Sequence, residues 1–314
     1  MPLLHYAKVN INSNIFDVYK QESSIEDIME RLFELINDKT EYEKSSYRSF
    51  MNGEERSEFR YSETYNFSEL NKVKKGNQFY IIGKLVRRYP IFTEEFDALT
   101  RTSRPAVISN NSTSILFYFD LESEIVVFSE RQKFGYNQFT ESMKELLNLS
   151  HAQIGYEVFL LNDPYTMKER LERAHKVKRI KSVVIPPNVN EEALGDLYDK
   201  DVKEMEEANI TKKTNLFEVN DKSNKGINVN SKLVSAVINT NEAYEKYAKG
   251  YGRLEVEGEY ADGSTFKFDS EEDSPYQTHI EEREKNDWQR FKALAQKGIS
   301  IFRAKVTINK HTDG

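Results

Sequence analysis

The sequence has no cysteine among its 314 residues. This absence excludes disulfide frameworks, thiolate metal sites and cysteine nucleophiles, and it fits a reducing compartment. No apolar run approaches the roughly 18 residues of a membrane span, and the opening stretch MPLLHYAKVN lacks the pattern of a signal peptide. We therefore expect a cytoplasmic protein that does not contact a membrane.

The glycines and histidines of the chain do not form the motifs that bind cofactors or metal ions. The stretch KGYGRLEVEGE contains three glycines but forms neither a dinucleotide-binding nor a Walker motif. The five histidines stand far apart, and none has metal-ligand spacing. The sequence therefore predicts no cofactor and no metal site.

The sequence is rich in charged and aromatic residues. Charged residues make up 31% of the chain, and 18 Tyr and 19 Phe argue against disorder. The net charge of −7 disfavours indiscriminate nucleic-acid binding, but the charges are segregated. Residues 71–104 and 168–181 are rich in Lys and Arg, whereas 191–207 and 269–287 each contain eight acidic and two basic residues. Such segments can attract a partner locally.

Hydrophobic periodicity predicts an α+β chain in which strands alternate with helices. The N-terminal part gives a strand, an amphipathic helix capped by Ser23 or Ser24, and then a long polar connection over residues 40–77. A strand that Pro90 stops or bends and a hairpin at 113–130 follow. Beyond them the pattern predicts helix, strand, helix and strand, at residues 135–150, 156–163, 164–175 and 180–186.

The C-terminal part begins after the prolines of PPN at 186–188. We expect an acidic helix at about 190–208, a linker at 211–230, and a helix at 231–250 that breaks near Asn239. A hairpin turning at the Asp-Gly of 262–263, a helix ending at Gly298 and a closing strand at 300–309 complete the prediction.

These elements predict a mixed or antiparallel sheet with helices on one face and a split βαβ, ferredoxin-like core. Three parts are expected: an N-terminal segment (1–76), a central ββαβαβ core (77–190) and a C-terminal α+β extension (191–314).

Basic residues beside aromatics make the leading candidate site. Cations next to Phe79, Tyr80 and Tyr89 could neutralise phosphates while the rings stack on bases, and a second group follows a helix at a helix–strand turn. The alternative is a solvated surface. The predicted nucleic-acid contacts, to single strands or RNA, are Lys74, Lys75, Arg87, Arg88, Lys176, Lys178, Arg179 and Lys181.

Two other classes of function stay open. A metal-dependent nuclease would need the fold to bring together carboxylates such as Asp120, Glu122 and Glu124, or Glu281 and Glu282 with His279. An assembly subunit would use the acidic segments 191–207 and 269–287 to dock on a basic partner or on a second copy.

Three stretches carry a resemblance to a known family. They are FYFDLESEIVVFSERQKFGYNQFTESMKELL, then VVIPPN, then GYGRLEVEGEY, within residues 77–280. Together they resemble an uncharacterised bacterial family whose members occur near phage-defence and restriction genes. The resemblance implies a setting in the conflict between bacteria and phages, and no catalytic residues. The expected function is therefore a non-enzymatic antiviral-defence protein that binds nucleic acid or another protein.

Overall fold

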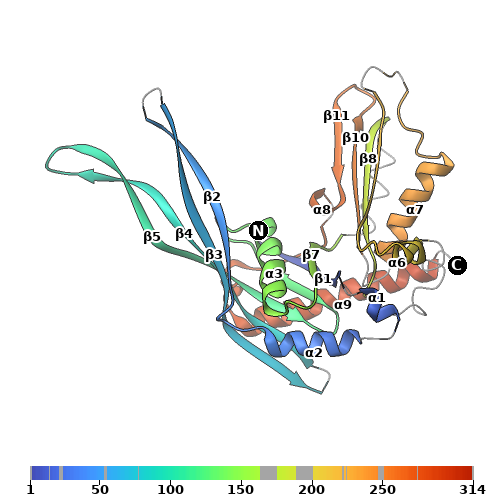
Figure 1. Ribbon diagram of the computed structural model, residues 1–314, viewed down its shortest axis with the longest axis horizontal. Coiled ribbons are helices and arrows are strands. Elements are labelled where there is room, and N and C mark those ends of the chain that lie inside the picture. The colour runs from blue at the N-terminus through green and yellow to red at the C-terminus, as the bar shows by residue number, and fades with distance from the viewer. Residues whose placement is uncertain are drawn as a thin grey trace.

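The protein, seen here as a computed structural model, forms two antiparallel sheets (Figure 1). The structure describes residues 2–13, 15–20, 24–52, 55–76, 78–162, 175–188, 201–220, 223, 225–246, 251–273 and 275–312. The predicted helix at 164–175 lies outside these residues except for His175, as does most of the predicted acidic helix.

The first sheet has eight strands in the order β12-β1-β6-β5-β4-β3-β2, with β7 also paired to β1. Its strands are β1 (Leu3–Ile11), β2 (Glu41–Asn52), β3 (Glu55–Lys75), β4 (Gln78–Asp97), β5 (Thr102–Asp120), β6 (Ile125–Phe128), β7 (Tyr156–Leu160) and β12 (Gln277–His279).

The second sheet has four strands in the order β11-β10-β8-β9. They are β8 (Lys176–Ile185), β9 (Lys213–Glu218), β10 (Tyr251–Glu259) and β11 (Thr265–Asp269). The described helices are α1 (Ile15–Tyr19), α2 (Ile25–Leu35), α3 (Tyr136–Ser150), α6 (Lys203–Glu207), α7 (Lys232–Lys246), α8 (Ser270–Asp273) and α9 (Trp288–Thr312), with a 3₁₀ turn at Glu282–Glu284. Within this part of the chain, no helix is both long and apolar enough to span a membrane.

Helices cover both faces of the first sheet, so the prediction that they lie on one face is wrong. On one face, α2 and α3 pack against sheet residues such as Phe67 and Phe117. On the other, α9 packs Phe291 and Ile299 against a core that includes Tyr118. Apolar side chains on both sides of the central strands explain this double cover, because a face left bare would expose them.

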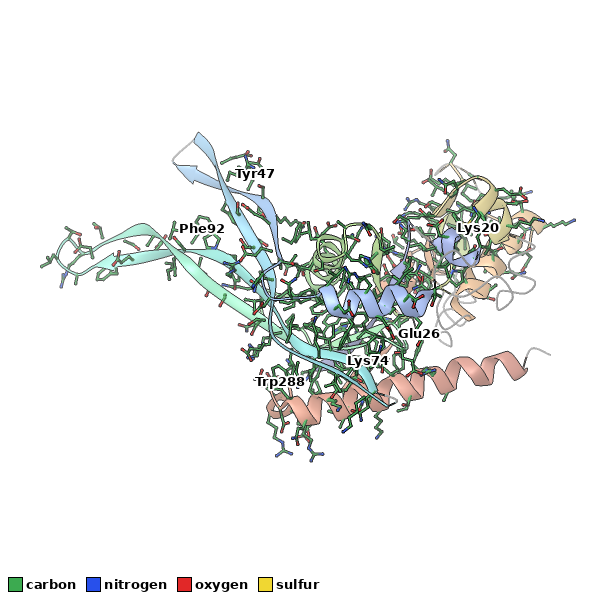
Figure 2. The ribbon with its side chains drawn as sticks, turned by 60° about the horizontal axis from the view of Figure 1, so that its bottom comes forward. Lys20, Glu26, Tyr47, Lys74, Phe92 and Trp288 are labelled. Atoms are coloured by element: carbon green, nitrogen blue, oxygen red, sulfur yellow. The ribbon has the colours of Figure 1, made fainter. Side chains whose placement is uncertain are left out.

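Two hairpins extend beyond the helix-covered part of the sheet (Figure 1). β3 and β4 pair from Lys75–Gln78 as far as Thr64–Arg88, and no further pairs between them follow. From there β3 continues with β2 as the β2–β3 arm (residues 44–52 and 55–63), and β4 continues with β5 as the β4–β5 arm (residues 89–111). Figure 2 shows that Tyr47 and Phe92 lie on these two diverging arms.

The polar connection predicted over residues 40–77 is in fact β2 and β3. Much of their length lies in an arm where neither face is covered by a helix, so the sequence there shows no apolar alternation. The predicted domain boundary at residues 76 and 77 falls at the turn between β3 and β4, inside one sheet.

Pro90 does not end β4, which continues to Asp97. The pairing with β5 shifts between Tyr89–Asn111 and Ile91–Ile108, so the proline lies at an irregularity of the ladder. Proline lacks a backbone N–H and is tolerated where a ladder bond is missing.

The predicted C-terminal strand is wrong, because α9 runs from Trp288 to Thr312 without a break at Gly298. Phe291, Ala295, Ile299 and Phe302 are buried at helical spacing. Gly298 is needed for close packing, since a Cβ there would lie 1.8 Å from the Tyr6 hydroxyl. The glycine that suggested a helix end is instead a contact point in the helix interior.

β8 does not join the sheet of β7, so the predicted ββαβαβ core is divided between two sheets. The linker predicted at 211–230 contains β9, and α7 runs unbroken through Asn239. The hairpins at 113–130 and 252–268 are confirmed, and Gly263 has the positive φ (+81°) expected of its turn.

Candidate functional site

The predicted basic site begins with Arg87, which is buried within the first sheet. Its Nε and Nη2 atoms donate to the Glu63 carboxylate at 3.0 and 2.7 Å. Burial opposes ionisation of Glu63, but the hydrogen bonds from Arg87 and Tyr65 outweigh it and lower the pKa of that carboxyl. Arg87 therefore holds β4 to β3 and does not present its charge to solvent.

The other predicted cations of the first sheet are more exposed than Arg87. Lys74 forms an ion pair with Glu30 of α2, and Arg88 binds Glu41 of β2 at 2.6 Å. Lys75 is exposed at the end of β3. Lys74 and Lys75 thus lie at one end of the β3–β4 ladder and Arg87 and Arg88 at the other, and three of the four have carboxylate partners.

The β8 cations face carboxylates on both neighbouring strands. Lys178 contacts Glu259 at 2.7 Å, and Lys181 contacts Glu255 at 2.7 Å. Arg179 reaches Glu218 of β9 at 2.9 Å and Glu257 of β10 at 3.2 Å, whereas Lys176 donates to the Ser223 carbonyl at 2.6 Å. Lys178, Arg179 and Lys181 are thus matched by cross-strand acids, which lie far from them along the chain.

The carboxylates of the nuclease alternative do not converge. Asp120 accepts a hydrogen bond from the Ser123 backbone at 2.9 Å, Glu122 is exposed, and Glu124 is fully buried. Glu281 and Glu282 are exposed and pair with Arg283 and Lys285. Among the described residues, no group of three His, Asp or Glu side chains could hold a metal ion.

Sequence reasoning missed a buried polar cluster around Glu124. The Lys8 Nζ lies 3.2 Å from Glu124, and neither side chain has any exposed surface. Asn188 donates to Glu124 at 2.6 Å and accepts from the Ile11 backbone at 2.9 Å. Since Asn188 follows β8 and Ile11 ends β1, the cluster ties the second sheet to the first.

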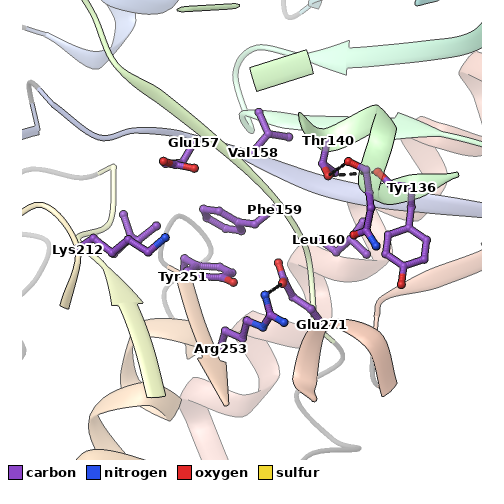
Figure 3. Close-up of a pocket in the computed structure, with 12 residues that line it drawn as sticks. Tyr136, Thr140, Glu157, Val158, Phe159, Leu160, Lys212, Tyr251, Arg253 and Glu271 are labelled. Carbon is purple, nitrogen blue, oxygen red and sulfur yellow. Dashed lines mark hydrogen bonds and ion pairs between the residues drawn. The ribbon is translucent and has the colours of Figure 1, made fainter. Parts of the chain in front are cut away.

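A small pocket of about 200 Å³ lies where the two sheets meet (Figure 3). Phe159 of β7 and Tyr251 of β10 form its ring contact, with centroids 3.7 Å apart. Arg253 binds Asp269 through Nε and Nη2, at 3.1 and 2.5 Å, and Glu271 through Nη1 at 2.7 Å.

Burial raises the pKa of Glu271, and Arg253 offsets this only in part. Burial also raises the pKa of Tyr251. Arg253 and Glu271 of this pocket are therefore already paired with each other, which favours a structural junction over a ligand site. Asp269 and Glu271 are also withdrawn from the acidic docking surface predicted over 269–287. In the other acidic segment, Asp201 is buried beside Lys213 and Tyr244.

A larger groove, about 1,090 Å³, lies at the foot of the β4–β5 arm. Its walls come from β1, β4, β5 and the segment after β6, with Leu3, Tyr89, Asn111 and Thr113 among them. Ser129 also lines it, and the Ser129 Oγ is buried without a hydrogen-bond partner among the described residues. A buried hydroxyl in this state is a position where an incoming polar group can bind.

The β4–β5 arm carries the most conspicuous apolar surface. Leu99, at its tip, is 97% exposed, and Phe96 is 65% exposed. Val107 and Ile108, on β5, are 51% and 53% exposed. The stretch FTEEFDALT contains these tip residues, but nothing in its sequence signals that they extend beyond any core.

The family comparison adds to this geometry. A domain of unknown function, DUF4747, matches residues 10–297. The chain belongs to this family. The match confirms the resemblance to an uncharacterised domain family, over a longer stretch than residues 77–280, and says nothing of neighbouring genes. No curated protein matches the chain.

Proposed function

We propose that this member of the family is a cytosolic, non-enzymatic protein-interaction module that takes part in an assembly through its β-arms. The observation that carries the proposal is the exposure of Phe96 and Leu99 at the end of a hairpin that no helix covers. Large apolar side chains exposed together at the end of one uncovered hairpin favour an interaction site.

Burial of these side chains against a partner would be favourable. Removing a Phe or Leu side chain from water is worth about 1.5–3 kcal/mol. Tyr47, 65% exposed, gives the β2–β3 arm a similar contact residue. Aromatic side chains on rigid strands are favoured at interfaces, because little conformational freedom is lost when they bind.

The charge pattern favours a protein partner over nucleic acid. Most of the predicted phosphate contacts already bind carboxylates or backbone carbonyls, and a phosphate would have to displace them. The outer part of the β4–β5 arm carries Glu94, Glu95 and Asp97 against Arg101 and Arg104. Nucleic-acid binding and a role in phage defence remain predictions.

We also propose that the first sheet contains a ferredoxin-like core. The antiparallel order β7-β1-β6-β5 and the chain order β1, α2, β5, β6, α3, β7 support it, because a split βαβ unit has this arrangement. The strands β2, β3 and β4 would then be an insertion between α2 and β5 that builds the arms.

The experiment compares immobilised wild-type protein with Phe96→Ser/Leu99→Ser and with a matched control, Leu233→Ser. Leu233 is 67% exposed on α7, away from the arms. Bound proteins, the chain's own copies included, are quantified by mass spectrometry. We expect a set of proteins that wild type and control retain and the arm variant loses. Equal binding to all three would contradict the proposal.

A further inference from the structure

The groove at the foot of the β4–β5 arm has one wall made by the segment that follows β6. β6 ends at Phe128, and a turn soon after it is closed by two backbone hydrogen bonds between Arg131 and Phe134, at 3.2 and 3.0 Å. Arg87 of β4 donates to the carbonyl of Lys133 in this turn. The backbone of the segment is therefore fixed against the sheet, as a preformed binding site requires.

Polar contacts tie this wall to β1 and α3. The Glu130 carboxylate accepts a hydrogen bond from the backbone N–H of Tyr136 at 3.1 Å and lies 3.6 Å from Nε2 of His5. The buried His5 ring has its Nδ1 atom 3.2 Å from the Gln277 amide nitrogen. Burial lowers the pKa of His5, and Glu130 opposes this only in part. These side chains are engaged with one another, so His5 is neutral at pH 7 and the groove takes its positive charge from elsewhere.

Ser129 is the polar group of this wall that the fold leaves unsatisfied. The residue lines the groove and is 6% exposed, and its Oγ is buried without a hydrogen-bond partner among the described residues. A buried hydroxyl in this state costs free energy that a hydrogen bond to a bound molecule would recover. Ser129 is therefore a position where the groove can gain from a polar ligand.

Lys285 supplies a cation beside the same segment. Its Nζ donates to the carbonyl of Glu130, the residue after Ser129, at 3.2 Å and lies 3.4 Å from the Glu282 carboxylate. The Lys285 side chain is 13% exposed, whereas that of Glu282 is 79% exposed and is screened by water. A lysine ammonium has three N–H donors, and these two contacts leave one for a ligand.

The charged residues that line the groove favour an anion. They are three cations, Arg131, Lys133 and Lys285, and two acids, Glu130 and Glu282. Glu130 already binds the first backbone N–H of α3, and Arg131 and Lys133 are exposed at the rim. An anion that enters the groove thus meets more unmatched positive than negative charge.

We propose that this groove binds a sugar phosphate, free or as part of a nucleotide, with its phosphate group held by Lys285 and the Ser129 hydroxyl. A phosphate offers several acceptor oxygens, so it can accept from an ammonium and a hydroxyl at once. Asn111 and Thr113 of β5 supply an amide and a hydroxyl toward the sugar, and Leu3 and Ile91 give apolar contact. The volume of about 1,090 Å³ suits a ligand of this size. The inference goes beyond the proposed role of the arms and does not depend on it.

The test begins with calorimetric titration of the wild-type chain with ribose 5-phosphate and with adenosine monophosphate. Inorganic phosphate, citrate and adenosine are the comparison probes. We expect one of the two sugar phosphates to bind at one molecule per chain, more tightly than any comparison probe, and to bind more weakly as salt is added, because the contact is charged. Failure of both sugar phosphates to bind would overturn the proposal. Equal or tighter binding of inorganic phosphate or citrate would overturn the sugar phosphate as ligand.

Two variants locate the binding in this groove. Ser129→Ala should raise the dissociation constant about tenfold, because a hydrogen bond to a charged group is lost. Its melting temperature should not fall, since the hydroxyl has no partner in the fold to lose. Lys285→Gln should weaken binding about tenfold or more through loss of the charge.

The matched control is Lys232→Gln, which removes an exposed cation at the start of α7. It should bind the sugar phosphate as the wild type does. Unchanged affinity in Ser129→Ala and Lys285→Gln would overturn this groove as the site. A drop in the melting temperature of Ser129→Ala with unchanged affinity would show instead that the hydroxyl serves the fold.

Discussion

β8 and the β4–β5 arm differ in whether their conspicuous side chains have partners within the fold. Along β8, Lys178, Arg179 and Lys181 each meet a carboxylate on a neighbouring strand. Along the arm, Phe96 and Leu99 meet no core at all. The comparison teaches that a conspicuous run of charge can be internally matched, whereas a short apolar tip that looks ordinary in sequence can be the unmatched surface.

The largest expected loss of folding stability comes from breaking the buried Lys8–Glu124 ion pair. Lys8→Met leaves the Glu124 carboxylate buried without its cation, which should lower the free energy of unfolding by about 3–5 kcal/mol. Urea unfolding measures it. The double variant Lys8→Met/Glu124→Gln should recover part of the loss, and a loss below about 1 kcal/mol in the single variant would contradict the role given to this pair.

Glu63→Gln should lower the free energy of unfolding by about 3 kcal/mol at pH 7, because Arg87 then loses its buried partner. The folded-state pKa of Glu63 is lowered, so its contribution is present above the unfolded-state pKa and is lost as pH falls through the folded-state value. The difference between wild type and variant should shrink as the pH is lowered below the ordinary range of a carboxyl. A difference that does not change with pH would contradict this assignment.

Gly298→Ala should cost about 1–3 kcal/mol through overpacking, since the new methyl group would meet the buried Tyr6 ring. An exposed glycine in a helix would instead gain stability from the change. Thermal unfolding distinguishes the two, and an increase in the melting temperature would show that α9 does not pack on β1 as described.

Several elements could be predicted from sequence because local and long-range signals agree. The helix α2 is capped by Ser24 and buries Ile28, Met29 and Leu32, as its pattern predicts. The β5–β6 hairpin follows from two apolar runs around a polar turn.

The arms could not be predicted, since strands without a covered face show no apolar alternation. The prediction of a strand at 300–309 was wrong for a different reason. The spacing of Phe291, Ala295, Ile299 and Phe302 continues one helical face, but Gly298 outweighed it in the prediction.

The candidate site was harder still to predict. Nothing local shows that Glu218, Glu255, Glu257 and Glu259 would lie beside the basic residues of β8, because the pairs join residues 39 to 81 positions apart. The position of Arg87 against Glu63 likewise depends on the pairing of β3 with β4, which the polar sequence of β3 does not announce.

A smaller effect is expected on β8. Lys178→Gln/Arg179→Gln/Lys181→Gln removes partly exposed pairs, each worth about 1 kcal/mol or less. Binding of labelled single-stranded RNA, measured by fluorescence anisotropy across a salt series, should be weak and equal for wild type and variant. Steep salt dependence that the variant loses would restore the nucleic-acid hypothesis.

The most direct test of the central claim, that the arms are an interaction surface and not part of the fold's stability, is a paired measurement on Leu99→Ser and Leu233→Ser. Urea unfolding and the amount of partner protein retained by the immobilised chain are recorded for both variants and the wild type. We predict that both variants unfold within about 0.5 kcal/mol of wild type and that only Leu99→Ser weakens association. Loss of stability in Leu99→Ser, or equal association of both variants, would contradict the account.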